Sequence, residues 1–220
     1  MTFSGFNPDA MSFFQELAGN NNRGWWLANK SRFEANVRGP LLALMEQLGS
    51  DYGTLKTFRP NRDTRFGANK DPYKEQISFV AYGASGTACY LELSATGMFV
   101  GGGYWQPGKD QLERFRNLVD DSRLVGDLEA TLDQLGESGY VISQDSALKT
   151  SPRGFDPKHP KIELLRLKSL AVGKTIPISA WFFTPDALIR IKREWDTVMT
   201  WNEWLISSIG PTTQPRPVAR

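Results

Sequence analysis

The segment from Phe58 to Lys74, FRPNRDTRFGANKDPYK, concentrates cationic side chains in a stretch that cannot form one regular helix. Pro60, Gly67 and Pro72 interrupt helical continuity. Guanidinium groups suit phosphate and carboxylate ligands, because two parallel N–H donors match two oxygen atoms. This segment, the basic loop, therefore predicts an anion site whose ligands are Arg59, Arg62, Arg65, Lys70 and Lys74.

Three arginines of the basic loop recur at a spacing of three residues. Arg59, Arg62 and Arg65 would share one face of a short 3₁₀ turn, whereas in an extended segment Arg62 would point away from the other two. Asp63 can orient one of them, and Tyr73 can stack on a flat ligand. A structural alternative is an Arg and Asp lattice that only holds the loop against the core.

Three consecutive glycines, Gly101, Gly102 and Gly103, stand at the end of an expected strand and precede Trp105. Such a run allows backbone N–H groups to approach a ligand and form an anion-binding concavity. Its spacing fits neither a Walker loop nor a dinucleotide fingerprint. A bulge or a tight strand exit explains the run of glycines equally well. Trp105, like Tyr73, can stack on a flat part of a ligand.

A second basic segment, from Lys149 to His159, adds Lys149, Arg153 and the only histidine to the candidate site. We expect at least one of these two cations to share a pocket with the arginines of the basic loop. His159 or Asp63 would handle a proton if the protein catalyses a reaction. A helix cap or a surface position is the structural alternative for His159. One histidine and one cysteine make a His-based or Cys-based metal site improbable, so no metal or cofactor is expected.

Composition restricts the classes of partner. The formal net charge of +2, from 26 basic and 24 acidic residues, is too small for a dedicated nucleic-acid coat protein, so any basic patch must be local. Cys89 excludes an internal disulfide. Neither a signal peptide nor an apolar stretch of about 20 residues is present, so we expect a cytoplasmic protein without a membrane span. The sequence does not indicate an oligomeric state.

Hydrophobic periodicity changes along the chain and predicts an α+β fold. Helical spacing at the start gives way to alternation from Ile77 to Val100, which predicts an antiparallel meander sheet packed by several helices. We expect a single domain over residues 1–210, followed by a disordered tail over residues 211–220. The last helix has Thr184 as its cap and ends before Gly210. Its apolar residues should form one buried stripe: Leu188, Ile191, Trp195, Val198, Leu205 and Ile209. We also expect helices over 25–37, 41–48 and 161–169, and a helix capped by Asp110 with Glu113. Gly39 and Pro40 should interrupt the chain between the first two of these helices, and a proline-rich turn should precede the third. Strands are expected at 140–142, at 147–149 and within 170–178.

Several motifs occur together in a specific order. NNNRGWW and NKSRFE are followed by RPNRDTRF with NKDPYK, then FVGGG, and finally PRGFDPKHP running into ELLRLKS. In this order the chain resembles an uncharacterised family of bacterial and fungal proteins known as domain of unknown function 2461, over roughly residues 13–205. The resemblance implies that the motif regions belong to one domain. It supplies no activity.

The residue chemistry favours a compact domain that binds a small molecule bearing phosphate or carboxylate. One alternative is a nucleic-acid-binding module that uses the same cations on phosphates and the exposed aromatic rings on bases. A structural or adaptor protein without a ligand is another. A bound anion would distinguish the first class from the third, and a long basic surface would favour the second. Whether the protein is an enzyme is left open.

Overall fold

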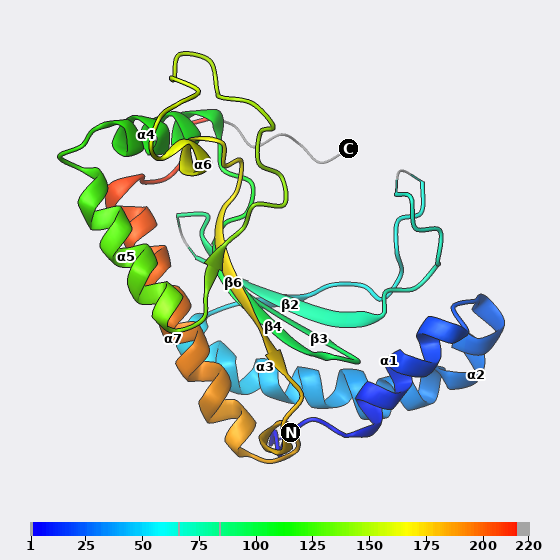
Figure 1. Ribbon diagram of the computed structural model, residues 1–220. Helices are drawn as coiled ribbons and strands as arrows, with labels where there is room; N and C mark the ends of the chain where they lie inside the picture. The colour runs from blue at the N-terminus through cyan, green and yellow to red at the C-terminus, as the bar shows by residue number, and fades with distance from the viewer. Residues whose placement is uncertain (1, 66, 84, 215–220) are drawn as a thin grey trace. The chain divides into compact units, whose positions relative to one another are not determined.

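The computed structural model describes residues 2–65, 67–83 and 85–214 (Figure 1). The fold is α+β: a run of helices is followed by a run of strands and then by further helices and strands, with a π-helical segment labelled η1 and a 3₁₀ segment labelled η2. In chain order the elements are α1 (Asp9–Gly19), α2 (Arg23–Phe33), η1 (Glu34–Arg38), α3 (Gly39–Tyr52), β1 (Leu55–Thr57), β2 (Gln76–Tyr82), β3 (Ala88–Ser94), β4 (Gly97–Tyr104), α4 (Lys109–Asp120), α5 (Val125–Glu137), β5 (Val141–Ile142), α6 (Ile162–Leu165), β6 (Leu170–Pro177), η2 (Ala180–Phe183) and α7 (Asp186–Ser208).

The strands form one six-stranded antiparallel sheet in the order β1-β2-β3-β4-β6-β5. The four strands at one side follow one another in the chain, which confirms the predicted meander. At the β1 edge, Leu55 lies opposite Ala81 and Thr57 lies opposite Phe79. In β3 buried Cys89, Leu91 and Leu93 alternate with half-buried residues, because successive side chains of a strand point to opposite faces.

The chain divides into two compact units, and each takes segments from distant parts of the sequence. Unit 1 comprises Met1–Tyr82, Tyr90–Val100 and Thr175–Trp195, and unit 2 comprises Gly83–Cys89, Gly101–Lys174 and Asp196–Arg220. Each unit has fully buried large side chains of its own: Phe13, Phe14, Leu44, Phe79 and Trp195 in unit 1, and Phe115, Leu128, Leu165, Trp201 and Leu205 in unit 2. A single domain over residues 1–210 stays a prediction.

The expected break between two early helices is absent. Gly39 and Pro40 lie within a continuous helical segment, and Gly39 has helical φ and ψ angles of −58° and −54°. Pro40 has no N–H and its ring would crowd the carbonyl one turn earlier. The helix accommodates it by widening over Glu34–Arg38, where the N–H of Gly39 donates to the Glu34 carbonyl five residues back. The prediction of a break was therefore wrong, because a π segment relieved the clash that it assumed.

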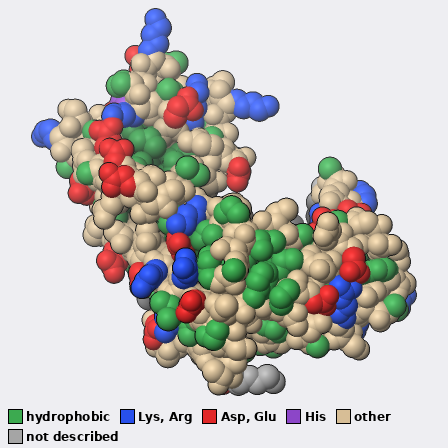
Figure 2. Space-filling view, turned by 60° about the horizontal axis from the view of Figure 1, so that its bottom comes forward, with side chains coloured by type: hydrophobic (Ala, Val, Ile, Leu, Met, Phe, Trp, Pro, Cys, Tyr) green, Lys and Arg blue, Asp and Glu red, His purple; other side chains and the backbone are tan. Residues whose placement is uncertain are grey.

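Other local expectations met different outcomes. The last helix is confirmed, and buried Ile191, Val198 and Leu205 follow its predicted stripe. The helix expected over residues 161–169 shrinks to Ile162–Leu165, and residues 147–149 form no strand. No helix among the described residues has the length and apolar character needed to cross a membrane. On the face shown in Figure 2, hydrophobic side chains gather in the middle and charged side chains surround them.

The capping role expected for Asp110 was also wrong. The helix begins after Gly108, whose backbone N–H donates to the side-chain oxygen of Gln111 at 2.9 Å. The Asp110 carboxylate accepts hydrogen bonds from the hydroxyl of Thr212 and the N–H of Thr213. These contacts hold residues 212 and 213 of the expected tail against α4, whereas residues 215–220 lie outside the described residues.

Candidate functional site

The basic loop is a narrow stem of two extended arms. Asn61 forms an antiparallel bridge with Tyr73. The N–H of Arg62 donates to the Pro72 carbonyl, and the N–H of Lys74 donates to the Pro60 carbonyl, both at 2.8 Å. The arms therefore bring cations from the two ends of the loop together, which the linear spacing of the arginines did not predict.

Tyr73 fixes the stem to the helices of unit 1. Its backbone N–H and carbonyl both bond the Asn21 side chain, at 3.1 and 2.9 Å. Its ring stacks on Trp26 of α2 with a centroid distance of 4.2 Å and an interplanar angle of 7°. Since Tyr73 is 7% exposed, the structure gives it a packing role, and stacking on a ligand stays a prediction.

Three cations of the stem, Arg59, Arg62 and Lys74, form what we call the cation cluster. The Lys74 ammonium lies 5.5 Å from the centroid of the Phe58 ring. Burial, followed by the charge of Arg59, lowers the pKa of Lys74, and Arg62 adds to this effect against the opposing charge of Glu92. Among the described residues, no carboxylate makes an ion pair with any of the three.

Arg62 is also incompletely bonded. Its Nη2 donates to the Tyr73 carbonyl at 3.4 Å, which is a long hydrogen bond. Its Nε atom is buried and has no hydrogen-bond partner among the described residues. A buried guanidinium donor without a partner is costly, so the stem carries positive charge that its own residues do not compensate.

The remaining candidates of the basic loop bond locally. Arg65 makes two hydrogen bonds with Asp63, at 3.0 and 2.7 Å, and this contact keeps the pKa of the Asp63 carboxyl well below its ordinary value. The Arg65 side chain is 73% exposed. Lys70 donates to the Thr64 carbonyl at 2.8 Å. The predicted cations of the basic loop therefore fall into two groups. The cation cluster makes no ion pair with a described residue, whereas Arg65 and Lys70 bond to other residues of the loop.

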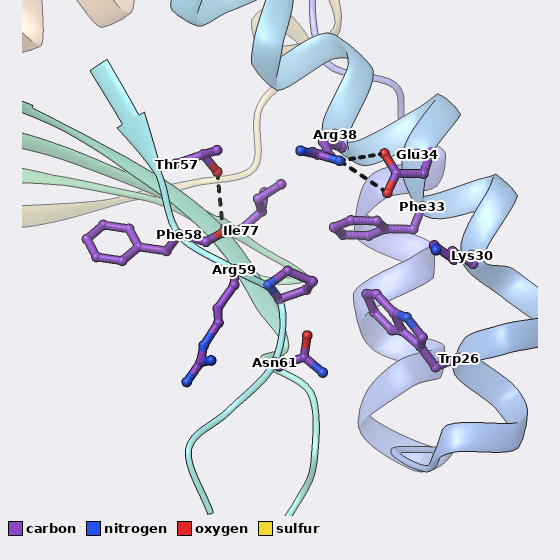
Figure 3. Close-up of a pocket in the computed structure, with 11 residues that line it drawn as sticks. Trp26, Lys30, Phe33, Glu34, Arg38, Thr57, Phe58, Arg59, Asn61 and Ile77 are labelled. Atoms are coloured by element: carbon purple, nitrogen blue, oxygen red, sulfur yellow. Dashed lines mark hydrogen bonds and ion pairs between the residues drawn. The ribbon is translucent and has the colours of Figure 1, made fainter. Parts of the chain in front are cut away.

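A pocket of about 430 Å³ lies between the α2–η1 segment and the chain around Thr57–Asn61, entirely within unit 1 (Figure 3). Trp26, Lys30 and Phe33 reach it from α2, and Ile77 from β2. In Figure 3 the Phe58 ring points away from the helical side, so this ring belongs to the face where Lys74 lies. The lining residues are Trp26, Lys30, Phe33, Glu34, Arg38, Thr57, Phe58, Arg59, Pro60, Asn61 and Ile77.

The π segment supplies the charged wall of this pocket. Arg38 forms an ion pair with Glu34 at 3.1 Å, and both residues line the cavity. Lys30 has no ion pair with a described residue, so the pocket keeps cationic character beside its aromatic walls. π-helical segments occur frequently at functional sites, because they displace side chains from the regular helical positions.

Sequence reasoning missed the helical side of the pocket. Trp26, Lys30 and Phe33 follow one another at spacings of four and three residues, which places them on one helix face. A lysine between two aromatic residues on a face that should be buried was the available signal. It was overlooked because the aromatic residues were interpreted as core, and Phe33 and Trp26 are indeed 3% and 6% exposed.

The three glycines are buried inside β4, in which Gly101–Gly103 belong to unit 2. A Cβ atom at Gly102 would collide with the carbonyl oxygen of Ala88, and Gly103 has a φ of +117°. These glycines allow close approach of neighbouring backbone, and an anion-binding role for them stays a prediction. Trp105, which follows them, is 61% exposed.

The second basic segment belongs to unit 2. Lys149 and Arg153 are exposed, and their sharing of a site with the basic loop stays a prediction. His159 lies 3.5 Å from Asp120 through its Nε2, and its Nδ1 accepts a hydrogen bond from the N–H of Lys161 at 3.0 Å. The imidazole thereby contacts the turn that precedes α6. Within the described residues no group of three or more His, Cys, Asp or Glu side chains could hold a metal ion.

Comparison with protein families finds a match that covers most of the chain. A family model described as conserved hypothetical protein (DUF2461) matches residues 9–204. No curated protein and no solved structure matches the chain. The matched range contains the basic loop, the pocket, the three glycines and His159, so the family model covers every element of the candidate site.

Proposed function

Since the chain belongs to the family of conserved hypothetical proteins with domain of unknown function 2461, whose description names no activity, we propose a function from the site itself. Unit 1 binds a small ligand that carries a phosphate or carboxylate group together with an apolar part. The cation cluster holds the charged group, and the adjacent pocket accepts the apolar part.

The absence of acidic partners for the cation cluster carries this proposal. Arg32 is paired with Asp9 and Glu16, Arg123 with Asp121, and Arg166 with Glu163. In the cluster none of the three cations pairs with a carboxylate in the described part of the chain, and the charges of Arg59 and Arg62 both act on Lys74. A purely structural loop gains nothing from gathering like charges, whereas an anion that binds there is attracted by all three.

Arg59 joins the cluster to the pocket. It lines the cavity, and its charge contributes to the lowered pKa of Lys74. In Figure 3 the Arg59 guanidinium points away from Trp26 and Phe33, so a ligand that rests on these rings needs a length of chain between its apolar part and its charged group. Pockets with mostly apolar walls and a few convergent polar groups are the usual form of small-molecule sites.

The proposed function is binding, without a catalytic proton transfer. Because Arg65 keeps the pKa of Asp63 well below its ordinary value, this carboxylate is a weak proton acceptor at neutral pH. A nucleic-acid-binding module remains the alternative. It would use the same cations on phosphates.

We expect phosphate-bearing or carboxylate-bearing metabolites to raise the melting temperature of the protein. A ligand that binds only the folded state stabilises it by RT ln(1 + [L]/Kd), which is about 2.7 kcal/mol at 100 times Kd. The measurement is a thermal-shift screen of such metabolites at constant ionic strength. The increase in melting temperature should be much smaller in Arg59→Gln. This substitution removes one cation of the cluster and breaks no hydrogen bond among the described residues.

Arg123→Gln is the control, since it removes the same charge from an 85% exposed side chain in unit 2, together with the ion pair to Asp121. It should leave the shift unchanged, and added chloride at equal ionic strength should not produce one. If no anionic metabolite stabilises the wild type, the structural interpretation of the loop is correct. A response confined to single-stranded or duplex nucleic acid would support the alternative.

A further inference from the structure

The arrangement around Lys74 indicates which kind of anion the site takes, an inference that rests on the proposed function. We propose that the cation cluster selects a tetrahedral dianion, such as the phosphate group of a phosphomonoester, over a carboxylate, and that Lys74 takes up a proton when the dianion binds. Neither property follows from the presence of a basic loop alone.

The balance of charge in the cation cluster favours a dianion. Three cations converge from the two arms of the stem, and the acidic group that influences Lys74 is Glu92 of β3. The Glu92 carboxylate already accepts a hydrogen bond from the Tyr90 hydroxyl at 2.6 Å and a longer one from Gln76 at 3.4 Å. With Lys74 protonated, the three cations and Glu92 together have a net charge of two positive units. A dianion neutralises this charge, whereas a carboxylate neutralises only half of it.

The surroundings of the Lys74 amine weaken its hold on a proton. It is half-buried over Phe58, whose ring contacts Tyr90 edge to face at a centroid distance of 6.1 Å. Arg59 and Arg62 from the basic loop repel a third positive charge, whereas Glu92 attracts it. The Tyr90 hydroxyl adds no charge, because burial raises its pKa above the ordinary value. Burial and the two arginines therefore lower the pKa of Lys74 in the empty site.

A bound dianion reverses this effect. Two negative charges next to Lys74 outweigh the repulsion from Arg59 and Arg62, so the pKa of Lys74 rises on binding. Between the lowered pKa of the empty site and the higher pKa of the complex, binding is accompanied by proton uptake. By linkage, affinity is highest at a pH below the pKa of Lys74 in the empty site, and it falls as the pH rises through that value.

Isothermal titration calorimetry with sulfate and with inorganic phosphate tests this inference. At about pH 9 both are dianions, and an ordinary lysine with a pKa of about 10.4 is still protonated. Sulfate does not titrate in this range, so any proton taken from the buffer is bound by the protein. In buffers of different ionisation enthalpy, the wild type should show uptake of a fraction of a proton, and acetate should bind at least about tenfold more weakly, as expected for a charge interaction worth about 1.4 kcal/mol.

Lys74→Arg is the decisive variant, because arginine stays protonated throughout this range. It should bind sulfate without proton uptake and without loss of affinity between about pH 7 and pH 10. If sulfate or phosphate binds the wild type with no buffer-dependent heat, or if acetate binds as tightly, the inference fails while anion binding stands. If the cluster binds no anion, both the inference and the proposed function fail.

Discussion

Replacing Trp195 with alanine is expected to lower the free energy of unfolding by about 3 to 5 kcal/mol, as truncation of a buried tryptophan usually does. Trp195 is fully buried in unit 1. Its ring meets Tyr52 edge to face at 4.9 Å and Phe79 at 5.5 Å, and its Nε1 lies 3.4 Å from the Tyr90 carbonyl. The substitution leaves a large cavity and removes the hydrogen bond to the Tyr90 carbonyl. Chemical denaturation monitored by circular dichroism measures the loss.

Trp105→Ala provides the control for Trp195→Ala. Its side chain is 61% exposed, so removing it should change stability by no more than about 0.5 kcal/mol. A loss below about 1 kcal/mol for Trp195→Ala would contradict the structure, since such a value is typical of a peripheral helix.

Gly102→Ala is expected to destabilise the protein by about 3 kcal/mol, the upper end of the usual cost of overpacking. The added methyl group would collide with the Ala88 carbonyl oxygen and with the side chain of Val198, all within unit 2. Because the backbone of a paired strand cannot move aside cheaply, the strands must separate locally. The midpoint of urea unfolding measures the effect.

Gly126→Ala tests whether this cost comes from packing and not from the loss of glycine itself. Gly126 lies in α5, and nothing approaches within 4 Å of the added methyl group. Alanine has the higher helix propensity, so this variant should be more stable by about 0.4 to 1 kcal/mol. Similar stability in the two variants would show that Gly102 is not confined as the structure describes.

Elements whose residues follow one regular period could be predicted from the sequence. The stripe of α7 and the alternation of Cys89, Leu91 and Leu93 both correspond to single buried faces. Prediction from local sequence rules failed where the surrounding structure offered another way to satisfy the same residue. Pro40 stays inside a helix because a π segment absorbs its clash, and Asp110 leaves its capping role because Thr212 offers a partner about a hundred residues away.

The candidate site shows the same division. The density of cations between Phe58 and Lys74 was visible in the sequence, but which of them pair was not. Arg65 finds its partner two residues away in Asp63, whereas Arg59 meets Lys74 only because the two arms of the stem pair across Asn61 and Tyr73. Lys30 and Arg38 line the pocket because α2 and η1 lie next to the chain at Thr57–Asn61. No local sequence pattern specifies this arrangement.

The position of a bound tetrahedral dianion tests the central claim most directly. Crystals soaked in tungstate, a heavy analogue of phosphate, reveal the anion by its anomalous scattering. We expect a peak within hydrogen-bonding distance of at least two of the Arg59, Arg62 and Lys74 side chains, and its loss in crystals of Arg59→Gln. Crystals in which tungstate occupies other sites and leaves the cation cluster empty would contradict the proposed function.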